Sequence, residues 1–126
     1  MSSLQISDLS KLCIHTITTK PWSIEEAAKN YAENGVKGIT VWRDAIQNRN
    51  IKKTGEMLRR HGLTIVSLCR GGFFAGKELR KRQAAIDDNR RAIEEAFELG
   101  SEMIVLVVAP IRNSHWKSRG CKFRMA

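Results

Sequence analysis

The strongest constraint on the fold comes from residues 86–110, where a helical pattern runs over a glycine straight into an apolar strand (IDDNRRAIEEAFELGSEMIVLVVAP). Four apolar side chains recur at the spacing of one helix face, namely Ile86, Ile93, Ala96 and Phe97. We expect this stripe to pack inward and Gly100 to end the helix. Residues 103–108 carry no polar side chain, so we expect a strand covered on both faces, as in parallel sheets wrapped by helices. The predicted fold class is α/β.

The preceding part of the chain repeats this alternation of strand and helix. Apolar, β-branched runs predict strands at residues 12–18, 38–43, 63–69 and 103–108. The first helix is expected to begin at a capping box formed by Ser23 and Glu26 and to end at Gly35. The second helix is expected to begin at Asn50 and to end at Gly62. Its predicted inner stripe contains Ile51, Thr54, Gly55 and Leu58.

Repeated strand and helix units with right-handed crossovers build either an open, doubly wound sheet or a barrel. No G-x-G-x-x-G follows the first strand, so a dinucleotide-binding sheet is not favoured. The chain has 126 residues, about half of the roughly 250 residues of a closed (β/α)₈ barrel. On this evidence the chain is one domain, and both architectures stay open.

The composition excludes several classes of protein. Hydrophobic residues make up 42% and charged residues 28%, as in an ordinary globular domain, and no apolar run approaches the roughly 20 residues of a membrane span. The first residues, MSSLQISDLSK, lack the basic and apolar regions of a signal peptide, so we expect a cytoplasmic protein. Cys13, Cys69 and Cys121 form no C-x-x-C pair, and their odd number argues against a disulfide framework.

The net charge of +9 is concentrated at the end of the chain, because residues 111–126 contain five basic and no acidic residues. These five are Arg112, Lys117, Arg119, Lys122 and Arg124. With Trp116 and Phe123 between them, the tail has the composition of a basic module that contacts nucleic acid by charge and stacking. The alternative is a solvated tail, which we favour because no nucleic-acid-binding motif is present. We therefore expect no nucleic-acid partner.

Four phrases carry a resemblance to a known family: KLCIHTIT, GVKGITVWRD, HGLTIVSLCRGGFF and AIDDNRRAIEEAFELGSEMIVLVV. In this order they resemble the amino-terminal half of the sugar phosphate isomerase/epimerase family, the xylose isomerase-like TIM barrels. The resemblance implies a (β/α) half-barrel of about four parallel strands, the N-terminal part of a TIM-barrel fold. We divide the chain into a polar leader (1–10), this half-barrel (11–110) and a basic tail (111–126) that matches nothing in the family. Such a chain resembles a truncated or frameshifted product, or a fragment.

The resemblance implies metal-assisted proton transfer on a carbohydrate or sugar phosphate. Family members bind a divalent metal through carboxylates and a histidine that the later strands mostly supply. Those strands are not expected here, so we expect this chain alone to hold no metal. The implied protein is isomerase- or epimerase-like and lacks part of the catalytic machinery.

Active sites of barrels lie at the carboxyl ends of the strands, which places four residues in the predicted substrate wall: His15, Trp42, Arg70 and Gly71. His15 either faces the barrel mouth as a hydrogen-bonding or acid/base group or is a satisfied core residue. Arg70 stands beside glycines and suits bidentate binding of a carboxylate or phosphate, although an ordinary surface loop has the same composition. Trp42 is expected to line a sugar site. Phe73 and Phe74 either wall the pocket or pack in the core.

The other titratable residues are expected to have structural roles. Four helical carboxylates, Asp87, Asp88, Glu94 and Glu95, are predicted on the exposed face in salt bridges with arginine. His61 lies beside the helix-ending Gly62 and complements the helix dipole. His115 and Cys121 lack metal-site spacing, so we predict no zinc site.

Association is predicted from the incomplete sheet. A closed barrel has no edges, whereas four parallel strands leave two edges and an uncovered inner face at residues 63–69 and 103–108. We expect a homodimer, or association through these exposed edges.

Overall fold

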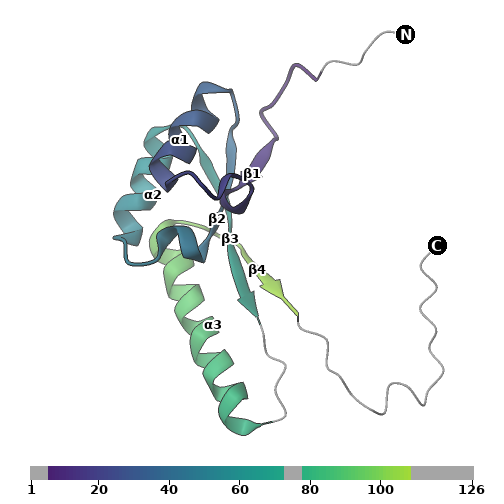
Figure 1. Ribbon diagram of the computed structural model, residues 1–126, viewed down its shortest axis with the longest axis vertical. Helices are drawn as coiled ribbons and strands as arrows, with labels where there is room; N and C mark the ends of the chain where they lie inside the picture. The colour runs from purple at the N-terminus through teal and green to yellow at the C-terminus, as the bar shows by residue number, and fades with distance from the viewer. Residues whose placement is uncertain (1–5, 73–77, 109–126) are drawn as a thin grey trace, which may run out of the picture.

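The computed structural model describes residues 6–72 and 78–108, which form a parallel sheet flanked by helices (Figure 1). Hydrogen bonds join four strands in the order β1-β2-β3-β4. The strands are β1 (Cys13–His15), β2 (Gly38–Trp42), β3 (Thr64–Gly72) and β4 (Ile104–Val107). The helices are α1 (Ile24–Glu33), α2 (Ile51–Arg60) and α3 (Leu79–Leu99), with the 3-10 helices η1 (Thr16–Thr19) and η2 (Arg43–Ile46). The predicted α/β class with four parallel strands is confirmed.

The first two helices begin at the predicted capping residues. Ser23 accepts a hydrogen bond from the Glu26 backbone at 3.1 Å, and Glu26 accepts one from the Ser23 backbone at 2.7 Å. The Asn50 side chain accepts from the backbone N–H of Lys53 at 2.9 Å. These bonds satisfy amide groups that the first turn of a helix leaves without an intrahelical partner, which explains why α1 and α2 start where they do.

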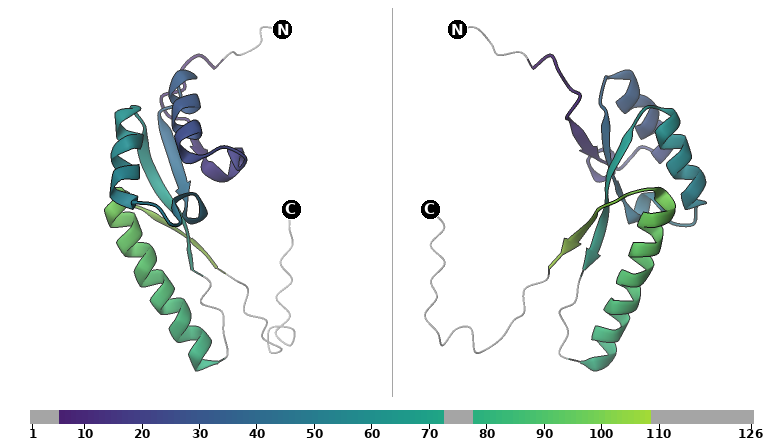
Figure 2. Two further views of the ribbon diagram at one scale, coloured as in Figure 1. Left: turned by 60° about the vertical axis from the view of Figure 1, so that its left-hand side comes forward. Right: turned by 180° about the vertical axis from the view of Figure 1, so that it is seen from behind.

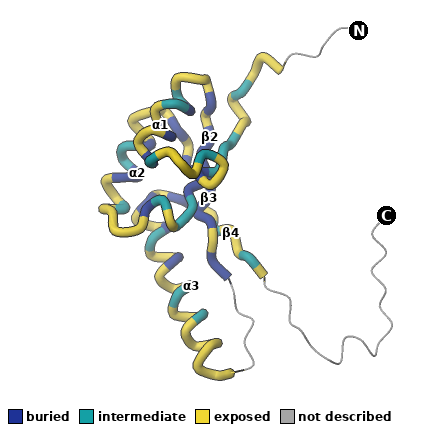
Figure 3. The backbone as a smooth tube through the Cα atoms, viewed as in Figure 1, coloured by how far each residue is buried: buried dark blue, intermediate teal, exposed yellow. Residues whose placement is uncertain are grey.

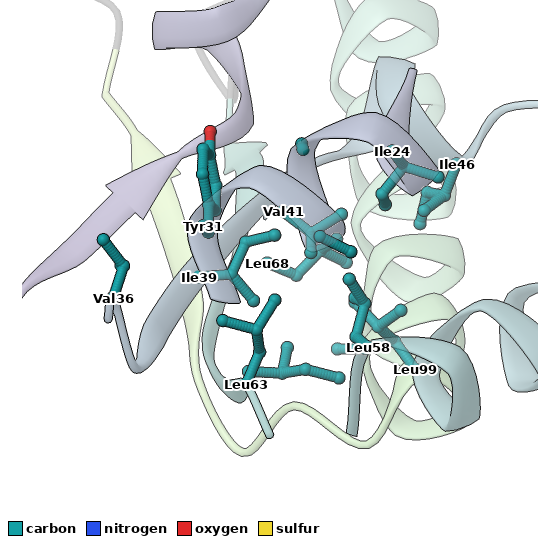
Figure 4. Packing of buried hydrophobic residues seen from close by; sticks show 14 residues of the cluster. Ile24, Tyr31, Val36, Ile39, Val41, Ile46, Leu58, Leu63, Leu68 and Leu99 are labelled. Atoms are coloured by element: carbon teal, nitrogen blue, oxygen red, sulfur yellow. The ribbon is translucent and has the colours of Figure 1, made fainter. Parts of the chain in front are cut away.

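The hydrophobic core lies between the helices and one face of the sheet (Figure 4). Ile39 and Val41 alternate along β2, so both point to this face, and both are fully buried. Leu68 of β3, Leu58 of α2 and Leu99 of α3 belong to the same cluster and are also fully buried. Burying a side chain of this size stabilises the folded state by roughly 1.5–3 kcal/mol. The core therefore holds all three helices on this side of the sheet.

The opposite face of the sheet carries a row of polar side chains. Thr40 alternates with the two core residues of β2 and points away from the helices. Its hydroxyl oxygen lies 3.3 Å from the Cys13 sulfur and 2.9 Å from the Ser67 hydroxyl. The row crosses β1, β2 and β3, so the middle of this face is more polar than the apolar surface predicted for residues 63–69.

The predicted inner stripe of the third helix is wrong in three of its four members. Ile86, Ile93 and Phe97 are 39%, 61% and 85% exposed. The buried residues of α3 are instead Asn89, Ala92, Ala96 and Leu99. This face of α3 turns toward the sheet because Asp88, Asn89 and Glu95 bond to residues at the ends of β2 and β3. Ala92 and Ala96 on the same face are small and allow a close approach. Figure 3 shows how much of the outward side of α3 is exposed.

The expectation that the fourth strand is covered on both faces is also wrong. Val105 is 36% exposed and Leu106 is 55% exposed. The cause is the position of β4 at the edge of the sheet, where β3 is its one partner among the described strands. The later expectation of exposed apolar surface on the open sheet is met at this strand.

A close approach between α2 and α3 fixes the arrangement of the two helices. Both helices lie on the same side of the sheet in the two views of Figure 2. A Cβ atom added at Gly55 would overlap with the carbonyl group of Leu99. The Arg59 guanidinium donates to the Leu99 carbonyl oxygen at 3.0 Å and so satisfies a group at the end of α3. The predicted inner position of Gly55 is thus explained by helix packing.

Candidate functional site

A cleft of about 730 Å³ lies at the carboxyl ends of the first three strands. Its lining includes Lys20 after η1, Trp42 at the end of β2, Arg70 near the end of β3, and Asp88 and Glu95 of α3. The carboxyl ends of parallel strands meet at one edge of a sheet, which is where ligands bind in α/β folds. This cleft is the candidate site.

Three of the four predicted site residues meet at this edge, where Trp42 and Arg70 line the cleft and His15 lies behind Trp42, outside the cleft lining. The Trp42 indole N–H donates to Nδ1 of His15 at 3.2 Å. The Arg70 guanidinium carbon lies 6.0 Å from the centroid of the Trp42 ring, within the range of a cation–π contact. Their role in binding a ligand stays a prediction.

Thr16 joins the ends of β1 and β2 beside this trio. Its hydroxyl accepts a hydrogen bond from the Trp42 backbone N–H at 2.9 Å, and the side chain is buried. The inward turn of Thr16 and the start of η1 end β1 at His15, so the first strand is shorter than the predicted residues 12–18. The turn brings Lys20 to the cleft.

Gly71, the fourth predicted site residue, is buried in β3 and pairs with Leu106 of β4. It does not line the cleft. A Cβ atom at Gly71 would lie 2.7 Å from the Asn89 side-chain oxygen, so a glycine is needed for α3 to come this close. The structural explanation for this glycine is helix packing.

Asn89 is a positioning residue that the sequence analysis missed. Its side chain accepts from the Gly72 N–H at 2.6 Å and donates to the Gly72 carbonyl at 2.8 Å. It also donates to the Ala85 carbonyl at 2.7 Å. The buried amide therefore holds the end of β3 against α3, and the only sequence signal was a polar residue at helical spacing from Ala92 and Ala96.

The Arg43 guanidinium forms the second link between the cleft edge and α3. It donates to both Asp88 oxygens at 2.9 and 3.1 Å, and to both Glu95 oxygens at 2.6 and 3.1 Å. The side chains of Arg43, Asp88 and Glu95 are 22%, 40% and 26% exposed. The predicted exposure is therefore wrong for Glu95 and met in part for Asp88, and the predicted pairing of both carboxylates with arginine is confirmed.

The electrostatics follow from these bonds. Hydrogen bonds to Glu95 and Asp88 raise the pKa of Arg43 above its usual value, and hydrogen bonds from Arg43 lower the pKa of Asp88. Arg43 thus stays charged and occupied, and it is poorly placed to bind a ligand. Burial raises the pKa of the Cys69 thiol, which keeps this residue protonated.

The described residues do not fit a divalent metal site. Over residues 6–72 and 78–108, no group of three or more histidine, cysteine, aspartate or glutamate side chains is placed to hold an ion. The two carboxylates at the cleft both accept from Arg43. A metal at this site needs ligands from elsewhere.

The remaining sequence predictions fall into two groups. His61 follows α2, and its Nδ1 lies 3.0 Å from the Met57 carbonyl oxygen, in keeping with a role at the helix end. Phe73, Phe74 and the tail at residues 111–126 lie outside the described residues.

Within the described part of the chain, no helix is long and apolar enough to cross a membrane.

Replacing Asp88 by Asn should lower the free energy of unfolding by roughly 1 kcal/mol at pH 7, because a charge-assisted hydrogen bond is lost at a site that solvent partly screens. The ordinary pKa of an aspartate is 3.8, and in the folded state the pKa of Asp88 lies below this value. Its stabilising contribution is therefore present above this value and is lost as the pH falls through the folded pKa. Urea denaturation of both proteins at pH 7 and at decreasing pH measures the difference, which should shrink in acid.

The matched control is Asp87→Asn, which removes an exposed carboxylate that lies 3.6 Å from Arg90 on the same helix. We expect a smaller effect for this variant. Equal effects of the two substitutions would contradict the role given to Asp88.

Comparison with known proteins agrees with this fold. The family model described as xylose isomerase-like TIM barrel matches residues 13–124, a range that takes in most of the tail predicted to lie outside the family pattern. Protein SMc04130 from Sinorhizobium meliloti 1021, known from a crystal structure, is 33% identical to this chain in sequence. The two structures superpose with a TM-score of 0.71 over 91% of this chain and 42% of that chain. No protein among the curated ones matches at a significant level.

Two further solved structures share the fold at lower identity. A xylose isomerase domain containing protein from Salmonella typhimurium LT2 is 16% identical, with a TM-score of 0.67 over 82% of this chain and 38% of that chain. A xylose isomerase-like TIM barrel/4-hydroxyphenylpyruvate dioxygenase fusion protein is 18% identical, with a TM-score of 0.67 over 75% of this chain and 15% of that chain. The chain spans less than half the length of each of these proteins. By its sequence and its fold, this chain belongs to the xylose isomerase-like TIM barrel family.

Proposed function

We propose that this chain provides the substrate wall of a sugar isomerase- or epimerase-type barrel. The observation that carries the proposal is the meeting of His15, Trp42 and Arg70 beside a cleft at the carboxyl ends of β1, β2 and β3. An aromatic ring offers a flat apolar surface, and the imidazole and guanidinium beside it offer hydrogen bonds. This combination suits a small carbohydrate, which has both apolar C–H groups and hydroxyl groups.

The charge around the cleft favours a sugar that carries a phosphate. Five basic residues line the cleft against three acidic ones: Lys20, Arg43, Arg49, Arg70 and Arg91, with Asp44, Asp88 and Glu95. Arg49 also forms an ion pair with Glu25. Asp88 and Glu95 pair with Arg43, and Arg91 lies 3.6 Å from Asp88, so these two carboxylates are matched by two guanidinium groups. A guanidinium binds phosphate oxygens in a bidentate manner, and we assign this role to Arg70.

The proposed chemistry is proton transfer next to a carbonyl group. It needs a general base and a group that polarises the carbonyl oxygen. The described residues contain no full metal-ligand set. We therefore propose that this part of the protein binds and orients the sugar, and that the groups that move the proton lie outside the described residues.

Binding of D-ribulose 5-phosphate should change the fluorescence of Trp42. We expect the change in the wild type and in Trp22→Phe, and its loss in Trp42→Phe. Arg70→Met should weaken binding by about tenfold or more, because hydrogen bonds to charged groups contribute about 1.5–3 kcal/mol. Fluorescence titration measures both effects. Wild-type affinity in Arg70→Met would contradict the proposed wall.

We also propose that the chain associates through the exposed surface of α3 and β4. Phe97 is 85% exposed and Leu106 is 55% exposed, and covering an apolar side chain of this size contributes roughly 1.5–3 kcal/mol. Sedimentation equilibrium at micromolar concentration should show a homodimer, and Phe97→Lys should lower the dimer fraction. The neighbouring exposed substitution Glu98→Lys is the control. A monodisperse 14.3 kDa monomer with a sharp thermal transition would refute association.

A further inference from the structure

We infer that Trp42 is a positioning residue that holds His15 as the neutral tautomer with its proton on Nε2. The imidazole then offers a hydrogen-bond donor to an oxygen atom of the ligand. Only this last step rests on the proposed function. The tautomer itself is argued from contacts among β1, β2 and their neighbours.

The direction of the hydrogen bond between the two rings decides the tautomer. The indole N–H of Trp42 is a donor and has no acceptor capacity. It lies 3.2 Å from Nδ1 of His15, so Nδ1 must accept and cannot carry a proton. A neutral imidazole has one N–H group, which therefore lies on Nε2. A doubly protonated ring would place two donors against each other and lose the bond.

The backbones of both residues are held by neighbouring side chains, and the indole ring has a further contact. The Trp42 backbone N–H donates to the Thr16 hydroxyl at 2.9 Å, and Arg70 lies over the indole ring. The Tyr31 hydroxyl donates to the His15 carbonyl oxygen at 3.5 Å. The contact between Trp42 and His15 is therefore built from the ends of two strands, and it is set before any ligand arrives.

The other ring nitrogen is left for a ligand. His15 is half-buried at the carboxyl end of β1, and within residues 6–72 and 78–108 no group forms a hydrogen bond with its Nε2. An N–H at this position can donate to a hydroxyl, carbonyl or phosphate oxygen. Because Nε2 already carries the proton and Nδ1 is occupied, His15 acts as a donor and not as a general base.

Nitrogen NMR of the whole chain at pH 8 tests the tautomer directly, because in a neutral imidazole one ring nitrogen carries the proton and the other does not. We expect the wild type and Trp22→Phe to show Nδ1 as the unprotonated and Nε2 as the protonated nitrogen of His15. In Trp42→Phe the ratio of the Nε2–H to the Nδ1–H form should fall by about two- to tenfold. An Nδ1–H form in the wild type, or an unchanged ratio in Trp42→Phe, would overturn the inference.

Two substitutions of His15 separate its two nitrogens and serve if Trp42→Phe does not fold. Asn retains an acceptor near the Nδ1 position, and Gln retains a donor near the Nε2 position. The indole N–H resonance of Trp42 should stay in place in His15→Asn and move in His15→Gln, with the Trp22 resonance as the internal control. Movement in neither variant would overturn the ring contact.

Affinity for D-ribulose 5-phosphate should depend on the other ring nitrogen. We expect wild-type affinity in His15→Gln, which keeps a donor near Nε2, and about tenfold lower affinity in His15→Asn. Wild-type affinity in His15→Asn would overturn the donor role. If the wild type itself does not bind this sugar, the proposed function fails, while the NMR result still decides the tautomer.

Discussion

The ion pairs between the Arg43 guanidinium and two carboxylates of α3 determine how the site is built. Arg43 directly follows β2, and its guanidinium binds the carboxylates of Asp88 and Glu95 on α3 with four hydrogen bonds. A planar guanidinium binds carboxylates in fixed geometry, so the bonds set the rotation of α3 about its own axis as well as its distance from the sheet. They also close one side of the cleft.

Two close contacts complete the arrangement that Arg43 begins. Asn89 binds both backbone groups of Gly72, and Gly55 allows the backbone of Leu99 to approach α2. With α3 held at three levels, Asn89, Ala92, Ala96 and Leu99 face inward, and Ile86, Ile93 and Phe97 face outward. The same arrangement places Arg70 over the ring of Trp42, where we propose that it meets the ligand.

Much of the fold could be predicted from local patterns. The capping residues Ser23 and Asn50 determine where α1 and α2 begin, and alternation in β2 separates Ile39 and Val41 from Thr40. These signals act over a few residues, which is why the sequence reveals them. The strand-end rule also brought His15, Trp42 and Arg70 onto one short list, although each comes from a different strand.

The inner face of α3 could not be predicted in the same way. Arg43 is separated from Asp88 by 45 residues and from Glu95 by 52, and no local pattern links them. Hydrophobic periodicity selected the stripe of Ile86, Ile93 and Phe97, whereas charge pairing and small residues select the buried face. The apolar composition of β4 predicted a strand covered on both faces, because an edge strand and a central strand of this composition differ only in their neighbours. The exposure of β4 could be predicted only from the number of strands.

We propose that the carboxyl edge of the first three strands is a ligand-binding wall, preorganised by its own contacts. Mapping amide chemical shifts during a titration with D-ribulose 5-phosphate tests it most directly. We predict shifts at residues 15–20, at residues 42–49 and at Arg70, with little change at Gly38, Thr64 and Ile104 at the opposite ends of the strands. Shifts confined to those opposite ends or to the outer side of α3 would contradict it.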